Sequence, residues 1–378
     1  MKIAFDLRRI QNPGIGRYMK RLVEEILKQE SDNDYLLILA PEASDAICSH
    51  CANVTRVLSK SRYYSVREQI ELPRILREHK VNLLHSPHFV LPLSRPCPTV
   101  VTIHDVVYIA CAEDLPSQLG KFYYAAMMRA SARFSTRIIT DSVFSKNEII
   151  RYLRVDPEKI TVIYPAVDPG FGRISDTRIL DAVRSEYGID RNFILYAGIY
   201  KGRKNHAGLF RAFQHFLANG EDAQLVIAGP MNEGDPHLQK LAEELGISER
   251  VIFTGFIADS KLCALYSAAR VYACPSLYEG FGFTVLEAMA CGAPVVCSEE
   301  ASLPEVAGDA ALYANPQDSE AFADALYRAF TDESLRRDMI ERGRKNLRRF
   351  NWRHAATDSR ATYNAALGDT TVQPVALY

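Results

Sequence analysis

The segment from Val271 to Cys297 constrains the fold most, because it has the order of a strand, a glycine loop, a helix and a second strand. The apolar residues before Pro275 predict a buried strand. Gly280 and Gly282 let the backbone approach a ligand without a Cβ in the way, and a helix is expected from about Phe283. The unpaired N–H groups at the start of that helix favour an anion. The segment therefore predicts an α/β fold with a ligand site at a strand end.

Two carboxylates bracket this glycine loop. Glu279 precedes the predicted helix and Glu287 lies in its second turn, so both can face a ligand held at the helix start. Each carboxylate accepts two hydrogen bonds, which suits the vicinal hydroxyls of a ribose or a sugar. The alternative is an ordinary strand–helix–strand unit with surface glutamates.

A basic loop follows the predicted strand Phe193–Gly198 and opens another helix. Its cations are Lys201, Arg203 and Lys204, and three cations at a helix start predict an anion site. A merely solvated loop is the alternative. Arginine and lysine suit phosphates, so the loop and the two glutamates together describe a nucleotide-sugar pocket. Its diphosphate would be the leaving group, stabilised by Arg203 and Lys204.

The composition narrows the class of protein. The 378 residues suggest about two domains, and the net charge of −1 gives no overall field for nucleic acid. No apolar run is long enough for a membrane helix, and the N-terminus has the pattern of a strand rather than a signal peptide. We therefore expect a cytoplasmic protein, with peripheral contact to the inner membrane as a further expectation.

Strands alternate with helices in both halves of the chain, which predicts two Rossmann-like domains with a cleft at their facing carboxyl edges. The expected boundaries are residues 1–170 for an acceptor domain and 171–350 for a nucleotide-sugar domain. Residues 351–378 are expected to form a helix that crosses back to the first domain, followed by a loose tail.

Some local predictions are less specific. A helix is expected over 65–79 with Val66, Ile70 and Leu72 inward, and one continuous helix over 318–349. The helix predicted over 115–134 is basic and aromatic, so it is either a core helix with a solvated face or a surface for a lipid-linked acceptor.

Glycines and histidines in the first half leave alternatives open. Gly14 and Gly16 precede a helix, but a third glycine is missing, so the dinucleotide fingerprint is incomplete. Close approach to a phosphate or sugar and a plain turn are both open. Cys48-Ser-His50-Cys51 has three potential metal ligands, yet a helix end is the favoured interpretation. We expect no metal site.

Several motifs resemble the retaining family-four glycosyltransferases of the GT-B fold, over nearly the whole chain. Glu279 and Glu287, with seven residues between them, match the E-x7-E signature. One departure is Ile199, where many relatives carry an arginine. The other matching motifs are Arg203-Lys204-Asn205, Tyr278-Glu-Gly-Phe-Gly, Ser302-Leu-Pro-Glu-Val-Ala-Gly, Phe350-x-Trp352, Gly14-Ile-Gly16-Arg17 and His104-Asp105.

The resemblance implies roles for individual residues. His104 and Glu279 would be the catalytic residues beside the reacting sugar. The implied donor-binding residues are Gly16, Arg203, Lys204, Ile257, Lys261, Glu279, Phe281, Gly282, Phe283, Thr284 and Glu287. The implied acceptor-side residues are Gly14, Arg17, His85 and Asp105. No cofactor is implied, because such enzymes work without a metal.

Within the family, the segments 68–73 and 85–92 resemble bacterial mannosyl- or rhamnosyltransferases of surface polysaccharide synthesis, such as lipopolysaccharide synthesis. The implied donor is GDP-mannose or a similar GDP-sugar, and the implied acceptor is a glycan or a lipid-linked oligosaccharide. The alternatives are a GT-B nucleotide-sugar epimerase, a sugar phosphorylase, a non-catalytic nucleotide-sugar-binding subunit and an NAD oxidoreductase.

Overall fold

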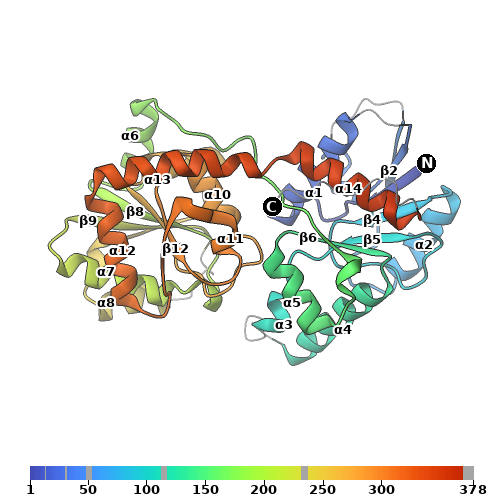
Figure 1. The fold of residues 1–378 in the computed structure, drawn as a ribbon, viewed down its shortest axis with the longest axis horizontal. Coiled ribbons are helices and arrows are strands. Elements are labelled where there is room, and N and C mark those ends of the chain that lie inside the picture. Colours follow the sequence, from blue (N-terminus) through green and yellow to red (C-terminus); the bar gives the residue numbers. More distant parts are fainter. Residues whose placement is uncertain (13, 30–31, 48–52, 112–116, 231–236, 369–378) are drawn as a thin grey trace. The chain divides into compact units, whose positions relative to one another are not determined.

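The computed structural model describes residues 1–378 apart from 13, 30–31, 48–52, 112–116, 231–236 and 369–378. The chain divides into two compact units, each with its own parallel sheet (Figure 1). Unit 1 comprises Met1–Pro165 and the segment that begins at Phe350, and unit 2 is Ala166–Arg349. The cysteine and histidine cluster at 48–51 and the tail from Asp369 lie outside the described residues.

Within the described residues, unit 1 is built on a seven-stranded parallel sheet in the order β3-β2-β1-β4-β5-β6-β7. The chain order reverses between neighbours β1 and β4, and ligands of open α/β sheets bind beyond the carboxyl ends of strands at such a point. The strands are β1 (Lys2–Asp6), β2 (Asp34–Leu39), β3 (Val54–Leu58), β4 (Leu83–Ser86), β5 (Thr99–Thr102), β6 (Arg137–Thr140) and β7 (Ile160–Val162).

Amphipathic helices cover this sheet. α1 buries Met19, Leu22, Val23 and Ile26, whose spacing of three and four residues places them on one face. The last helix, α14, packs beside α1, where the Gln29 side chain donates to a backbone carbonyl of α14. The unit 1 helices are α1 (Ile15–Lys28), α2 (Glu68–Glu78), α3 (Val107–Ala110), α4 (Gln118–Phe134), α5 (Val143–Leu153) and α14 (Trp352–Ala366).

The prediction for α2 was partly wrong. The helix begins at Glu68 rather than at 65, and Val66 and Ile70 are 80% and 68% exposed instead of inward. Leu72 is buried as predicted, but the inward position one turn earlier belongs to the carboxylate of Glu68. A charged residue breaks the apolar stripe there because a buried arginine binds it. The edge strand β3 was missed, since its residues are mostly exposed and lack an apolar run.

The described residues of unit 2 form a six-stranded parallel sheet in the order β10-β9-β8-β11-β12-β13. Here the reversal lies between β8 and β11, so the loops after these two strands leave the sheet beside each other. The strands are β8 (Asn192–Ala197), β9 (Ala223–Ala228), β10 (Val251–Gly255), β11 (Val271–Cys274), β12 (Val295–Ser298) and β13 (Ala311–Ala314).

The helices of unit 2 pack on both sides of its sheet. The single helix predicted over 318–349 is two helices, because Asp332 ends one and caps the next by accepting a hydrogen bond from Leu335 N at 3.0 Å. The elements are α6 (Thr177–Glu186), the 3₁₀ turn η4 (Gly202–Lys204), α7 (His206–Ala218), α8 (His237–Glu244), α9 (Asp259–Ala268), α10 (Phe283–Ala290), α11 (Leu303–Ala307), α12 (Ser319–Thr331) and α13 (Glu333–Asn346).

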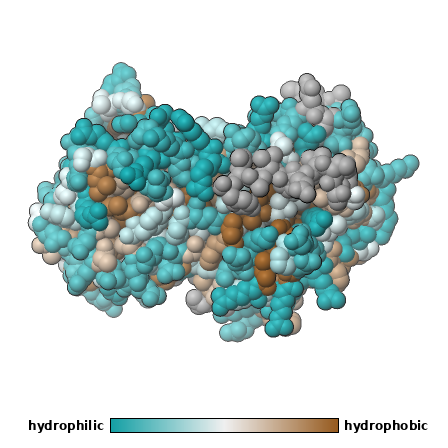
Figure 2. All heavy atoms as spheres, in the orientation of Figure 1, coloured by the Kyte–Doolittle hydropathy of each residue, from teal (hydrophilic) through white to brown (hydrophobic). Residues whose placement is uncertain are grey.

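Two parallel Rossmann-like sheets confirm the predicted fold class. The face shown in Figure 2 is mostly hydrophilic, with apolar atoms gathered in small patches on each unit. In the part of the chain that the structure describes, no helix is both long and apolar enough to cross a bilayer.

Candidate functional site

The two predicted loops of unit 2 meet at the reversal point of its sheet. The basic loop follows β8 and the glycine loop follows β11, and these strands are neighbours. The loops are joined by a backbone hydrogen bond of 2.7 Å from Leu277 N to Arg203 O. Asn205 also links them, because its side chain donates to Pro275 O at 3.3 Å and caps α7 by accepting from Gly208 N. Sequence segments 75 residues apart thus form one site.

The centre of this site is an ion cluster. Lys204 Nζ donates to Glu279 Oε1, and Arg203 Nη1 lies 3.6 Å from Glu279 Oε2. Ser276 Oγ donates to the same Oε1 at 2.8 Å, and Arg203 Nη1 donates to Tyr278 O at 3.2 Å. Three of the residues predicted for donor binding are therefore brought together, with their side chains largely buried.

Electrostatics keep Glu279 ionised. Burial by itself raises the pKa of a carboxyl, but the charges of Lys204 and Arg203 and hydrogen bonds from Lys204 and Ser276 outweigh it, so the pKa of Glu279 is lowered. At neutral pH the cluster holds two cations and one carboxylate. Among the described residues, two cations thus surround one carboxylate at the reversal point of the sheet.

Residues at the start of α11 contact and position the glycine loop. The Ser302 hydroxyl lies 2.9 Å from the carbonyl oxygens of both Glu279 and Phe281. Gly282 caps α10 with a φ of +101°, and a Cβ there would lie 2.9 Å from Leu303 Cδ2. Ser276 and Ser302 were missed by sequence reasoning as partners of the loop, although Ser302 opens one of the matched motifs.

The second glutamate of the motif, Glu287, lies on the helix that follows the glycine loop. Glu287 is buried in the second turn of α10, and the Tyr266 hydroxyl of α9 donates to its Oε2 at 3.3 Å. Glu279 and Glu287 are thus both buried carboxylates of one segment, but only Glu279 contacts the cations Arg203 and Lys204 in the described ion pairs.

The other predicted donor residues have different surroundings. Ile257 is buried, and the Lys261 ammonium pairs with Glu186 of α6. Phe281 is buried with its ring 5.1 Å from that of Phe283, so these two rings pack on each other at the start of α10. The residues predicted at the sugar and phosphate, Phe281, Gly282, Phe283 and Thr284, are consecutive around the N-terminus of this helix.

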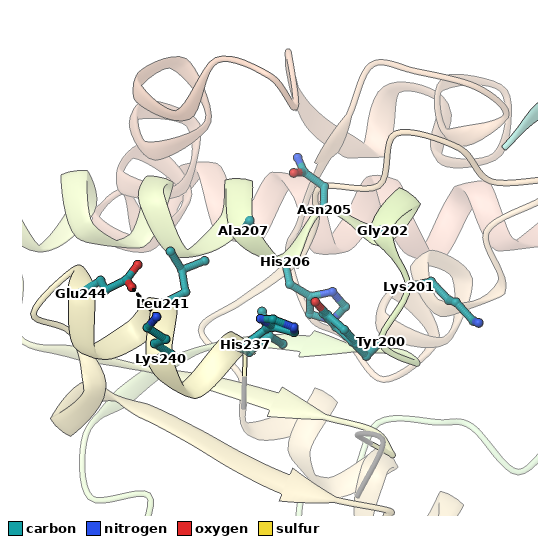
Figure 3. Close-up of a pocket in the computed structure, with 11 residues that line it drawn as sticks. Tyr200, Lys201, Gly202, Asn205, His206, Ala207, His237, Lys240, Leu241 and Glu244 are labelled. Atoms are coloured by element: carbon teal, nitrogen blue, oxygen red, sulfur yellow. Dashed lines mark ion pairs between the residues drawn. The ribbon is translucent and has the colours of Figure 1, made fainter. Parts of the chain in front are cut away.

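A separate cavity of about 420 Å³ lies on the other side of the basic loop (Figure 3). Tyr200, Lys201 and His206 line it from the loop and α7, and His237 and Lys240 line it from α8. Figure 3 shows the rings of Tyr200, His206 and His237 beside one another. The cations of the basic loop therefore lie in two places. Lys201 lines this cavity, whereas Arg203 and Lys204 contact the glycine loop.

In unit 1 the predicted catalytic histidine is paired with an acid. His104 Nδ1 lies 2.7 Å from Asp141 Oδ2, its Nε2 lies 3.3 Å from Pro87 O, and the ring meets Tyr18 edge-on at 4.7 Å. Both ring nitrogens face acceptors, which favours the doubly protonated ring. Burial lowers the pKa of His104, but the charge and hydrogen bond of Asp141 outweigh it, so the pKa is raised.

An Asp141→Asn variant should lower the pKa of His104, because the amide removes the charge that outweighs burial, and the Asp105 charge and the Pro87 carbonyl offset only part of this change. NMR titration of the ring resonances measures this change. An unchanged His104 titration would contradict the assignment of Asp141 as the cause.

The structure assigns His85 a packing role in place of the predicted acceptor contact. The side chain is fully buried, with Nδ1 2.7 Å from the Tyr363 hydroxyl and Nε2 3.0 Å from Thr102 Oγ1. It thereby ties β4 to β5 and α14 inside unit 1. Sequence reasoning could not anticipate this because Tyr363 lies 278 residues away.

The other predicted acceptor-side residues lie near the start of α1 and after β5. Gly14 is exposed with a φ of +74°, and Arg17 is half-buried in the first turn of α1. Gly16 is required by packing, since a Cβ there would lie 2.1 Å from Ile10 O. Asp105 Oδ1 accepts from the backbone N–H of Val107, the first residue of α3, at 2.9 Å. Among the described residues, no three acidic, cysteine or histidine side chains gather as a metal site would require.

Comparison with known proteins agrees with this architecture. The family model "Glycosyltransferase Family 4" matches residues 13–171, and "Glycosyl transferases group 1" matches residues 181–346. O-antigen chain mannosyltransferase B of Escherichia coli is 31% identical, over 96% of this chain and 99% of that protein. Serotype-specific mannosyltransferase WbdA of Escherichia coli is 30% identical over 69% of this chain and 32% of its own length.

Solved structures share the fold. A glycosyltransferase from Rickettsia africae superposes with a TM-score of 0.73 at 16% identity, covering 97% of this chain and 98% of that one. WaaG, a glycosyltransferase involved in lipopolysaccharide biosynthesis, superposes with a TM-score of 0.68 at 18% identity, over 98% of this chain and 100% of that one. The chain belongs to the GT-B glycosyltransferases that combine a family 4 and a group 1 domain, together with the O-antigen mannosyltransferases of Escherichia coli.

Proposed function

We propose that this glycosyltransferase moves a mannose-type hexose from a GDP-sugar to a glycan or lipid-linked oligosaccharide in bacterial surface polysaccharide synthesis, with retention of the anomeric configuration. The support for the sugar is the full-length similarity to an O-antigen mannosyltransferase. We also propose that the enzyme acts at the cytoplasmic side of the inner membrane, in peripheral contact with it.

The single observation that carries the donor assignment is the ion cluster of Arg203, Lys204 and Glu279. Its two cations suit a diphosphate, whose negative charge increases as the bond to the sugar breaks. The diphosphate would take over the cations, and the released Glu279 carboxylate could then accept hydrogen bonds from sugar hydroxyls. We further propose that Glu287 binds the ribose and that His104 contacts the reacting sugar.

We also propose that the reaction needs no metal ion, because Arg203 and Lys204 supply cationic charge to the leaving diphosphate. Transfer rates that are unchanged by a chelator are expected. A rate that falls with chelator and returns with a divalent cation would contradict this point.

The donor is tested by titrating the protein with GDP, UDP and ADP and by assaying transfer from the corresponding nucleotide sugars to lipid-linked glycans. Tighter binding of GDP and transfer from GDP-mannose are expected, and NMR of the product should show the anomeric configuration of the donor. Preferential binding of UDP would overturn the donor assignment, an inverted product would overturn retention, and epimerised donor without transfer would overturn the function.

A further inference from the structure

Tyr64 of unit 1 holds an unfavourable backbone conformation. Its φ is +63°, in the left-handed region, where a side chain such as tyrosine costs about 1 kcal/mol or more. Among the described residues it is the only aromatic one with a positive φ. Such strain persists only where the surroundings impose it, and it is common at ligand sites.

A buried charged network imposes this conformation. Glu68 Oε1 accepts a hydrogen bond of 3.0 Å from Tyr64 N, and its Oε2 lies 3.2 Å from Arg8 Nη2. Arg8 in turn binds Asp6 in a bidentate manner, at 2.8 and 2.7 Å. The three charged side chains are about 1% exposed. Burying ions is costly and adds little stability, so the network is better explained by the geometry it enforces.

The side chain of Tyr64 is positioned as well, yet it faces solvent. Arg9 Nη1 donates to the Tyr64 hydroxyl at 3.0 Å and to His88 Nε2 at 3.2 Å, since a guanidinium can only donate. The ring of Tyr123, on α4, meets that of Tyr64 at 6.0 Å and 81°. Tyr64 and Tyr123 each remain 40% exposed.

Arg9 and His88, the partners of the Tyr64 side chain, lie at the reversal point of the unit 1 sheet. Arg9 follows β1 and His88 follows β4, the neighbouring strands between which the chain order reverses. Ligands of open parallel sheets bind at this place. Within the described residues Arg9 forms no ion pair with a carboxylate, so its hydrogen-bonding capacity is directed only at neutral groups.

We propose that Tyr64, Tyr123 and Arg9 form a subsite for a neutral hexopyranose ring of the acceptor, an assignment that rests on the proposed function. The C–H face of a pyranose carries a partial positive charge and packs on the negative face of an aromatic ring. The guanidinium donates to the ring hydroxyls. The buried network of Glu68, Arg8 and Asp6 then holds the Tyr64 ring in one orientation before the acceptor binds, so binding does not have to order this side chain.

The test is a Tyr64→Asn variant, because asparagine tolerates the left-handed conformation but has no ring. With a soluble mannose oligosaccharide as acceptor and saturating donor, the KM for acceptor should rise at least 10-fold. The KM for donor and the unfolding temperature should stay near those of the wild type. Tyr64→Phe, which keeps the ring, should restore most of the acceptor affinity.

Phe134→Asn is the matched control, since Phe134 lies on α4 as Tyr123 does, is 46% exposed and also has an arginine, Arg95, near its ring. It should leave the acceptor KM within about twofold. An unchanged acceptor KM in Tyr64→Asn, or an equal rise in the donor KM, would overturn the subsite. So would an effect confined to acceptors that carry a lipid diphosphate. Failure of the wild type itself to transfer sugar would overturn the proposed function instead.

Discussion

A Lys204→Met variant is expected to lose roughly 10²- to 10³-fold in kcat/KM for the nucleotide-sugar donor. Lys204 is the cation that binds Glu279 directly, and Arg203 lies 3.6 Å from the other carboxylate oxygen. Without the ammonium Arg203 is the one cation of the Arg203, Lys204 and Glu279 cluster that remains, so one of the two cationic contacts for the diphosphate is gone. Steady-state rates with varied donor measure the change.

Lys201→Met is the matched control for charge, because Lys201 belongs to the same loop but lines the separate cavity. We expect its kcat/KM to stay within about threefold of the wild type. The assignment of Lys204 to the diphosphate would fail if Lys204→Met kept a third of the wild-type kcat/KM. It would also fail if both lysine variants lost the same fraction of kcat/KM.

A second variant separates this loss from misfolding. Lys204→Met takes the nearer of two cations from the buried Glu279 carboxylate and leaves Arg203 at 3.6 Å, so it should lower the free energy of unfolding by less than the about 3–5 kcal/mol that a wholly unpaired buried charge costs. The double variant Lys204→Met, Glu279→Gln replaces both members of the nearer pair by neutral side chains and should regain part of the stability. It should regain none of the transfer activity, which chemical denaturation and rate measurements together would establish.

Acidification should destabilise unit 1 through its buried neutral histidines. Burial lowers the pKa of His85 to about 3, and burial together with the nearby Arg9 charge lowers that of His88 well below its ordinary value. In the unfolded chain these rings take up a proton near pH 6.5, so the unfolded state gains protons first and stability falls as pH drops below that value. Between pH 6 and pH 4.5 the protonation of His85 in the unfolded chain should lower the free energy of unfolding by about 2 kcal/mol, and His88 should act in the same direction.

The single tryptophan makes this measurable for unit 1 alone. Trp352 lies on α14 with its ring 6.0 Å from that of Tyr18, so its fluorescence follows the unfolding of this unit. Denaturant titrations measure how much the free energy of unfolding falls between pH 6 and pH 4.5. This fall should be smaller by about 2 kcal/mol in His85→Gln than in the wild type. An identical loss in both proteins would contradict a strongly lowered pKa of His85.

Much of the fold and the donor loop could be predicted from the sequence. Apolar runs that alternate with amphipathic helices determine two parallel sheets, because such strands can only be buried between helices. The glycine loop around Phe281 and the helix that begins at Phe283 were also predicted, because local backbone geometry depends on nearby residues.

Only the tertiary structure decided which side chains share a partner. The neighbouring positions of β8 and β11 bring Lys204 to Glu279, and those of β1 and β4 bring Arg9 to His88. His85 became a core residue because Tyr363 reaches it from the last helix. Glu68 could occupy an apolar position because Arg8, 60 residues earlier, donates a hydrogen bond to its carboxylate. A local pattern determines whether a residue lies on a strand or helix, but the partner across the sheet decides whether it binds a ligand or supports the fold.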